Sequence, residues 1–326
     1  MIKSVLIANR GEIAIRIART ARRMGIKTYV VRTAKEPEAV YLSAADAVIN
    51  FPETDGNIPE FLDIDRLVGL AREYKIDSLH PGYGYLSENA ELAERCRDNG
   101  IVFIGPSPEV IRLMGDKVAA KGIAAQSGVP MLGASQGAVH TLDEARKIAK
   151  RLGYPVIIKA VSGGGGRGMR IVHHQDELEQ LYKIATAEAQ VAFNDPSVFI
   201  EKYLENPKHI EFQIVADNYG NVVHLGEREC SIQRKHQKLM EEAPSPALDE
   251  RLRKKMAAAA VSLAKQAGYQ SLGTVEFLLD HQKHFYFMEM NTRIQVEHPV
   301  TEEITGIDLV ELQFNIAAGR KLPLRQ

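Results

Sequence analysis

Residues 289–297 contain several side chains that bind metals and anions in proteins. Glu289 and Asn291 are two residues apart, so on a strand they project from one face and offer two hard oxygen ligands, which Mg²⁺ prefers. Arg293 and Glu297 follow, an anion-binding cation and a candidate base. A solvated strand edge would give the same pattern, but the apolar residues just upstream indicate burial, and buried charges need partners. The segment therefore predicts a metal site beside an anion site.

A further carboxylate, Glu276, lies in an apolar stretch that predicts a strand over residues 273–279. If this strand pairs with residues 285–291 about a turn centred on 282–283, then 280 faces 285 and 276 faces 289. Directly opposed side chains lie within about 5.5 Å at Cβ, and two carboxylates that close repel unless a cation lies between them. The hairpin therefore predicts a metal clamp formed by Glu276, Glu289 and Asn291.

The run Ser-Gly-Gly-Gly-Gly-Arg-Gly at residues 162–168 contains the spacing G-x-G-x-x-G. It lies between two strand-like stretches, 156–160 and 169–172, whereas a dinucleotide fingerprint needs a strand, a loop and then a helix. A glycine-rich loop between strands favours a flap whose backbone N–H groups close over phosphates, although a surface hairpin has the same composition. Lys159, just upstream, is a candidate phosphate ligand. The chain has no P-loop motif.

Residues 233–238, Gln-Arg-Lys-His-Gln-Lys, form a dense cationic run. An extended conformation places Arg234, His236 and Lys238 on one face, where they can hold phosphates or a small oxyanion. A solvated loop remains the alternative. Residues 80–88 follow a predicted sheet strand, at the kind of edge where α/β sheets bind ligands, but their composition indicates no particular ligand.

The bulk composition describes an ordinary globular protein: 326 residues, 45% hydrophobic, 25% charged and a formal charge of -1. This balance argues against a partner that is a nucleic acid or a membrane surface. No apolar run approaches a membrane span, and the N-terminus turns directly into a strand pattern without the layout of a signal peptide. Cys96 and Cys230 lack disulfide or metal spacing, and we expect a reducing cytoplasm.

The order of elements predicts a mixed fold, α/β and α+β. Strands at 5–8, 27–32, near 78 and at 101–104 alternate with helices at 12–24, 64–74 and 89–98, which indicates a doubly wound parallel sheet. Helical residues 109–127 lead to a boundary near 128–130. A small α/β unit follows, with helices at 142–152 and 176–191 and strands at 156–160, 169–172 and 199–203. The rest predicts longer, hairpin-like strands at 210–216, 222–229, 273–279 and 285–290, with helices at 249–267 and 308–318.

Taken together, these segments resemble biotin carboxylase, the ATP-grasp component of biotin-dependent carboxylases. Matching blocks occur in order along nearly the whole chain: residues 7–14, 80–84, 113–117, the glycine loop, 201–205, 233–238 and 289–301. The resemblance implies an N-terminal, Rossmann-like pre-ATP-grasp domain followed by an ATP-grasp fold with a glycine-rich lid. The implied divisions are residues 1–114 for the first domain, 115–130 for a connecting helical segment, 131–204 for the lid subdomain, and 205–326 for a central and C-terminal subdomain that is incomplete relative to the family.

The resemblance also implies a reaction. ATP and bicarbonate form carboxyphosphate, and the carboxyl group passes to biotin on a biotin carboxyl carrier protein. The final acyl acceptor of the carboxyl group is chosen by a separate carboxyltransferase. The implied cofactors are ATP and Mg²⁺ or Mn²⁺ at two sites, with biotin as carboxyl acceptor. The resemblance also leaves open that the chain forms a homodimer.

Specific residues match the family's site. Those implied to bind ATP are Lys117, Lys159, Gly165, Gly166, Glu201, Lys202, Tyr203, Leu204, His209, Gln233, His236, Glu276 and Glu289. The implied metal ligands are Glu276, Glu289 and Asn291. The implied bicarbonate site comprises Lys238, Arg293, Gln295 and the backbone of Val296. Glu297 matches the base that deprotonates bicarbonate, and Arg293 and Lys238 are implied to act with it in catalysis.

The sequence departs from the family in two respects. Residues 33–45 look short and atypical beside the family's pattern, although they lie away from the matched motifs. Family members normally continue well past Gln326 into a segment that completes the last subdomain and supplies an arginine on the biotin side. ATP and metal binding are expected without this segment. One alternative is another ATP-grasp ligase, which would lack the run 293–297. The other is a nucleotide-binding module that is inactive without the C-terminal segment.

Overall fold

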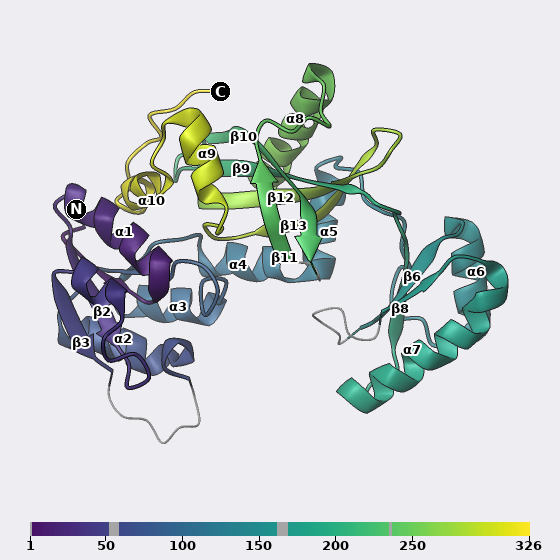
Figure 1. The fold of residues 1–326 in the computed structure, drawn as a ribbon, viewed down its shortest axis with the longest axis horizontal. Coiled ribbons are helices and arrows are strands. Elements are labelled where there is room, and N and C mark those ends of the chain that lie inside the picture. The colour runs from purple at the N-terminus through teal and green to yellow at the C-terminus, as the bar shows by residue number, and fades with distance from the viewer. Residues whose placement is uncertain (1, 52–58, 162–168, 235–236) are drawn as a thin grey trace. The chain divides into compact units, whose positions relative to one another are not determined.

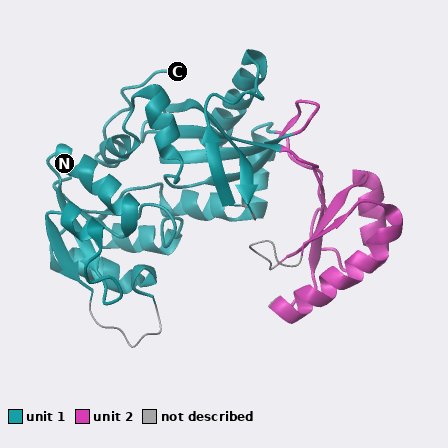
Figure 2. Cartoon of the chain, viewed as in Figure 1, with its two compact units in different colours: residues 1–129, 208–279, 287–326 teal, residues 130–207, 280–286 magenta. Residues whose placement is uncertain are grey.

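The structure is a computed structural model that describes residues 2–51, 59–161, 169–234 and 237–326 (Figure 1). The chain forms two compact units (Figure 2). Unit 1 comprises Met1–Val129, Lys208–Leu279 and Phe287–Gln326, and unit 2 comprises Pro130–Pro207 and Asp280–Tyr286. The finer division at residues 114, 130 and 204 stays a prediction.

Unit 1 begins with a parallel sheet in the strand order β3-β2-β1-β4-β5. Its strands are β1 (Ser4–Ile7), β2 (Lys27–Arg32), β3 (Ala47–Asn50), β4 (Ser78–His80) and β5 (Val102–Phe103). Between them lie α1 (Gly11–Arg23), α2 (Ile64–Glu73), α3 (Ala90–Asp98) and the 3₁₀ helices η1 (Val40–Ala44) and η2 (Glu60–Leu62). Side chains alternate across β1: Val5 and Ile7 pack in the cluster that contains α1, and Leu6 packs in the cluster that contains α2 and α3. The predicted doubly wound parallel sheet is confirmed.

Two helices follow where the sequence predicted one helical region. They are α4 (Pro108–Gly115) and α5 (Lys117–Gln126). The break falls at Asp116, whose Oδ1 accepts hydrogen bonds from the backbone N–H groups of Val118 and Ala119, each at 2.8 Å. An aspartate N-cap of this kind begins a new helix, and it makes Lys117 the first residue of α5.

The second sheet of unit 1 has the strand order β11-β10-β9-β12-β13. Its strands are β9 (Lys208–Ala216), β10 (Val222–Arg234), β11 (Gln237–Glu242), β12 (Ser271–Leu279) and β13 (Phe285–Asn291), accompanied by α8 (Glu250–Gln266), α9 (His298–Thr305) and α10 (Leu309–Ala317). One hydrophobic cluster joins Ile17 of α1 to Val215, Leu272 and Leu309. The first and last thirds of the chain therefore share a core.

Unit 2 contains an antiparallel sheet in the order β7-β6-β8, built from β6 (Val156–Ala160), β7 (Arg170–Val172) and β8 (Val198–Lys202). Its helices are α6 (Leu142–Leu152), the 3₁₀ helix η3 (Gln175–Glu177) and α7 (Leu178–Phe193). The glycine run therefore does follow one strand and precede another, as predicted. Gly165 and Gly166 lie outside the described residues, so their predicted role in a lid stays a prediction.

The turn before β13 differs from the prediction. The N–H of Asp280 donates to the carbonyl oxygen of His284 at 2.9 Å, so residue 280 lies opposite 284 and not opposite 285. The Asp280 carboxylate accepts from the N–H groups of Gln282 and His284, at 2.9 and 2.8 Å. These bonds stabilise a loop of three residues that ends with Lys283 at φ +66°, a common hairpin geometry. The predicted two-residue turn is wrong by one residue.

Within the described part of the chain, no helix has both the length and the apolarity that crossing a membrane requires.

Candidate active site

Three neighbouring strands of the second sheet place charged side chains at directly opposed positions. Arg228 on β10 pairs in register with Glu211 on β9, and Glu211 pairs with Glu276 on β12. Opposed residues on adjacent strands lie within side-chain contact. All three are almost completely buried, with exposed fractions of 0%, 0% and 3%. Two carboxylates at this distance need cations beside them.

Lys238 on β11 supplies one of these cations. Its Nζ lies 2.5 Å from Glu211 Oε2, 3.0 Å from Glu276 Oε1 and 2.6 Å from Glu297 Oε1. Burial lowers the pKa of Lys238, but the three carboxylates outweigh burial and raise it above its ordinary value. The lysine is therefore a fixed positive charge at neutral pH, shared among three acids.

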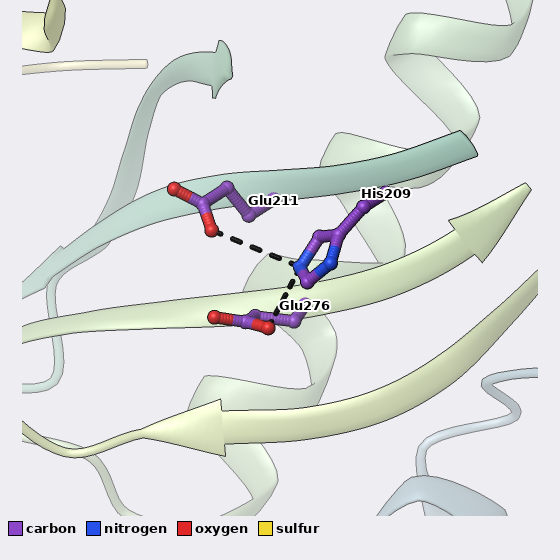
Figure 3. A group of neighbouring side chains, drawn as sticks. All are labelled: His209, Glu211 and Glu276. Atoms are coloured by element: carbon purple, nitrogen blue, oxygen red, sulfur yellow. Dashed lines mark ion pairs between the residues drawn. The ribbon is translucent and has the colours of Figure 1, made fainter. Parts of the chain in front are cut away.

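His209, also on β9, lies between the same two carboxylates (Figure 3). Its Nε2 is 2.7 Å from Glu276 Oε2 and 4.0 Å from Glu211 Oε2, although neither contact has the alignment of a hydrogen bond. Nδ1 is 3.0 Å from Nε2 of Gln233, an amide donor, so Nδ1 is the acceptor. Gln233 and His209, both predicted to bind ATP, are thus in direct contact.

Glu276 is the most highly connected acid of the site. Its Oε1 accepts hydrogen bonds from Asn291 Nδ2 and Gln295 Nε2, each at 2.8 Å, in addition to the contact with Lys238. Burial raises the pKa of Glu276, but His209 and Lys238 outweigh burial and hold it well below the usual range. Glu276 is therefore ionised. The contact with Asn291 brings two of the three predicted metal ligands together, despite the shifted turn.

Glu289, the third predicted metal ligand, has the opposite electrostatics. Loss of hydration raises its pKa, and the charges of Glu276 and Glu88 raise it further, while Lys117 and His209 lower it. Glu289 is exposed, so an ion from solvent can reach it. An accessible carboxylate that is repelled by a neighbouring carboxylate is a site where a divalent cation is favourable. Glu276, Glu289 and the Asn291 amide offer the hard oxygen donors that Mg²⁺ or Mn²⁺ takes, so the residues fit the predicted metal.

His209, Glu211 and Glu276 form a second group with metal-ligand spacing, because one donor atom from each lies within 4.8 Å of the others. The ammonium group of Lys238 already contacts both glutamates of this group. The group is therefore neutralised from within, and a metal adds less here than at Glu289.

Arg293 lies beside the predicted metal ligands. Its Nη2 donates to Asn291 Oδ1 at 3.0 Å, and its Nε donates to Glu88 Oε2 at 2.9 Å. The other oxygen of Glu88 accepts from the backbone N–H of Thr292 at 3.0 Å. Glu88, in the loop after β4, thus anchors both the backbone and the side chain at this point.

The remaining predicted residues of unit 1 line the same region. Glu297 is 8% exposed, and burial raises its pKa, but Lys238 and neighbouring hydrogen bonds lower it below the ordinary value, so it is held as a carboxylate. Gln295 bridges Arg228 and Glu276 through its amide. The side chain of Val296 is 60% exposed, in keeping with a predicted role for its backbone alone.

The predicted nucleotide residues of unit 2 make contacts within that unit. Lys159 Nζ donates to Glu201 Oε2 at 2.6 Å across the β6–β8 pair. Lys202 Nζ donates to the carbonyl oxygens of Gly153 and Tyr154, at 3.1 and 2.9 Å. The backbone N–H of Tyr203 donates to the carbonyl oxygen of Pro155 at 3.1 Å. Leu204 directly follows. His236 lies outside the described residues.

Sequence reasoning missed Glu211, Arg228 and Glu88. Glu211 lies between the apolar residues Ile210 and Phe212, whereas Arg228 lies between two glutamates. A charge inside an apolar strand needs a partner, so the sequence carried a signal for Glu211 but none for Arg228. Glu88 had no such signal, because its contacts lie far along the chain.

Comparison with known proteins agrees with this architecture. Residues 1–111 match the family model "Biotin carboxylase, N-terminal domain", and residues 116–325 match "Carbamoyl-phosphate synthase L chain, ATP binding domain". A biotin carboxylase of Nostoc sp. is 54% identical over 99% of this chain, which spans 72% of that protein's length.

Two solved structures are similar over almost the whole chain. A complex described as biotin carboxylase with β-γ-ATP, from Campylobacter jejuni, has a TM-score of 0.91 and 47% identity, covering 99% of this chain and 72% of the other. The biotin carboxylase domain of Hydrogenobacter thermophilus 2-oxoglutarate carboxylase, a dimer with MgADP, ADP and bicarbonate, has a TM-score of 0.90 and 48% identity, covering 100% and 72%.

The fold and site define an ATP-grasp protein. Within that class, the chain belongs to the biotin carboxylase family.

Proposed function

We propose that the chain catalyses the ATP- and bicarbonate-dependent carboxylation of biotin. The observation that carries this proposal is the position of Lys238, a permanent cation shared by Glu297, Glu276 and Glu211. It lies between the predicted base and the predicted metal ligand, where an anion and a phosphoryl group would react. Membership of the biotin carboxylase family supports the same assignment.

In the proposed reaction, Lys238, Arg293, Gln295 and the N–H of Val296 hold bicarbonate. Glu297 accepts the proton of bicarbonate, and a bicarbonate oxygen attacks the γ-phosphorus of ATP, with ADP leaving. The product is carboxyphosphate, whose carboxyl group passes to a ureido nitrogen of biotin as inorganic phosphate leaves and that nitrogen gives up its proton. An anion that draws Lys238 toward itself also weakens the largest influence that lowers the pKa of Glu297, so anion binding makes Glu297 a stronger base.

Glu276, Glu289 and Asn291 would hold Mg²⁺ or Mn²⁺. A bound divalent ion neutralises phosphate charge and stabilises the transferring phosphoryl group. Lys117, Lys159, Glu201, Lys202, Tyr203, Leu204, His209 and Gln233 are proposed to bind ATP, together with Gly165, Gly166 and His236.

The proposed partners are a biotin carboxyl carrier protein and a carboxyltransferase, because a carboxylated biotin is an intermediate. A homodimer and a cytoplasmic location are further proposals from the sequence.

The test is ATP hydrolysis measured with and without bicarbonate and free biotin, in the wild type and in Glu297→Gln. We expect bicarbonate to stimulate hydrolysis in the wild type. We expect Glu297→Gln to lose about 10²–10⁴-fold of that stimulated rate, the usual contribution of a general base, with ATP affinity retained. Glu303→Gln, at an exposed position of α9, the helix that begins directly after Glu297, is the matched control and should behave as the wild type.

Two results would contradict the proposal. Absence of bicarbonate stimulation in the wild type would refute carboxylation and leave a nucleotide-binding module. Loss of ATP binding in a folded Glu297→Gln variant would refute the assignment of Glu297 as the base.

A further inference from the structure

Arg228 is the largest fully buried side chain of the described residues, and the proposed reaction gives it no role. A guanidinium has five N–H donors, and Arg228 contacts five acceptors. Nε donates to Glu211 Oε1 at 2.6 Å and Nη2 to Gln295 Oε1 at 2.7 Å. The others are Gln213 at 2.9 Å, Thr301 at 2.8 Å and Thr274 at 3.5 Å. A planar fork bonded on every edge is held in one orientation.

The contact with Gln295 fixes the direction of its amide. Oε1 accepts from Arg228, and Nε2 donates to Glu276 Oε1 at 2.8 Å. The reversed amide would place its NH₂ group against the guanidinium and its oxygen against the carboxylate, and both contacts are repulsive. The amide NH₂ of Gln295 is therefore held on the Glu276 side. This NH₂ group has a second N–H besides the one that donates to Glu276, and that second N–H can donate a hydrogen bond to an anion.

The contact with Glu211 controls the charge near Lys238. One oxygen of Glu211 binds Arg228 and the other binds Lys238. Arg228 therefore offsets a negative charge that would otherwise be balanced by Lys238 more fully. An ammonium less tightly held by Glu211 is better able to turn toward an anion.

We propose that Arg228 is a positioning residue for the anion site. It holds Gln295 with its amide donor toward the anion. It also offsets the charge of Glu211, so that Lys238 is free to bind the anion in addition to its carboxylate partners. This inference rests on the proposed function, since it names the bicarbonate site. Arg228 itself does not touch the anion. By contrast, replacing a residue that only fills the interior of the sheet would weaken the binding of ATP and of bicarbonate to the same extent.

The experiment compares Arg228→Lys and Arg228→Met with the wild type. Arg228→Lys keeps the charge but cannot bind Glu211 and Gln295 in the same planar geometry. The control is Arg253→Lys, since Arg253 also binds a buried glutamate, Glu227, at 2.8 Å. Bicarbonate affinity is measured from the dependence of the Tm on bicarbonate concentration, ATP affinity by equilibrium titration, and both KM values by ATP hydrolysis.

We expect Arg228→Lys to raise the bicarbonate Kd and KM about tenfold, by analogy with the loss of a residue that orients a metal-binding side chain. The ATP Kd should change less than about twofold. Arg253→Lys should change neither the affinity for bicarbonate nor that for ATP. Unchanged bicarbonate affinity in a folded Arg228→Lys, or an equal loss for ATP and bicarbonate, overturns the inference. A wild type that binds no bicarbonate refutes the proposed function instead.

A double-mutant cycle tests the route through the amide. Because both changes act on the same amide, Arg228→Lys and Gln295→Leu should be non-additive in bicarbonate Kd, whereas additive effects overturn the inference. Removing a buried charge endangers folding. If Arg228→Met does not fold, the result for Arg228→Lys alone decides the question. If neither folds, the cycle is run with Thr301→Val, which loosens the same guanidinium. Additive effects of Thr301→Val and Gln295→Leu would likewise overturn the inference.

Discussion

Replacing Lys238 with methionine measures how far the charge cluster depends on one cation. The change keeps the length of the side chain and removes three ion pairs, to Glu211, Glu276 and Glu297. Glu211 keeps Arg228, and Glu276 keeps His209, Asn291 and Gln295. Glu297 loses Lys238, which lowers its pKa more than Arg228 does.

The structure sets the expected magnitude. Removing one partner of a buried ion pair costs about 3–5 kcal/mol. Lys238 is 18% exposed and two of its three acids retain other partners, so the lower end applies, about 3 kcal/mol. Unit 1 has the size at which 1 kcal/mol shifts the Tm by about 2–4 °C, so we expect a fall of about 6–12 °C.

The measurement is thermal unfolding by circular dichroism, because the chain contains no tryptophan to report on unfolding by fluorescence. The two units can unfold separately, so the transition of unit 1 is the one compared. Lys208→Met is the control. Lys208 Nζ lies 3.0 Å from Glu229, but its side chain is 52% exposed, and such pairs contribute about 0–1 kcal/mol.

The reasoning fails if Lys238→Met shifts the Tm no more than Lys208→Met does. That result would mean that the carboxylates are balanced without the lysine, by proton uptake or by Arg228 and His209. Loss of bicarbonate-stimulated hydrolysis should accompany the stability change.

Two further predictions concern the metal and the pH dependence of stability. Glu289→Gln should raise the Mg²⁺ concentration needed for ATP binding about tenfold or more, because the ion loses a charged ligand; an unchanged Mg²⁺ titration would exclude Glu289 as a ligand. Burial lowers the pKa of His80 from 6.5 to about 3, and the nearby charge of Arg16 adds to this, while a bond to Gln313 opposes it. As the pH falls, His80 therefore takes up a proton in the unfolded chain before it does so in the folded one. The contribution of neutral His80 to the free energy of unfolding is complete above pH 6.5 and is lost as the pH falls toward 3, by as much as about 3–5 kcal/mol. His80→Asn should unfold with a flatter pH dependence between those values, and a dependence equal to that of the wild type would contradict the assignment.

The sequence was sufficient for elements whose signals are local. The helix predicted at residues 142–152 coincides with α6, because a capping box of Thr141 and Glu144 marks its start and Gly153 follows its end. The alternating strands and helices before residue 105 likewise determined the parallel sheet. Periodicity did not predict α9, a helix of eight residues that is too short to show a repeat.

The site was predictable only where its residues lie close in the sequence. Glu289 to Glu297 could be recognised as one segment, and hairpin pairing added Glu276. The predicted turn was wrong by one residue because the side chain of Asp280 closes a longer loop through local hydrogen bonds to Gln282 and His284, which the prediction did not include. Arg228 and Glu211 depend on the register of β9 with β10, which is fixed across the sheet and not within any short segment.

The shared core of unit 1 has a consequence for synthesis of the chain. Ile17 on α1 packs in the same cluster as Leu309 on α10, and Arg16 binds Asp308 at the start of α10. At about 5–20 residues per second, the roughly 290 residues between them take on the order of 15–60 s to translate. During that interval this apolar face of the nascent parallel sheet lacks its cover, whereas most of unit 2 is complete much earlier. We therefore expect the ribosome-bound chain to recruit chaperones through its first hundred residues, and to release them only when α10 emerges.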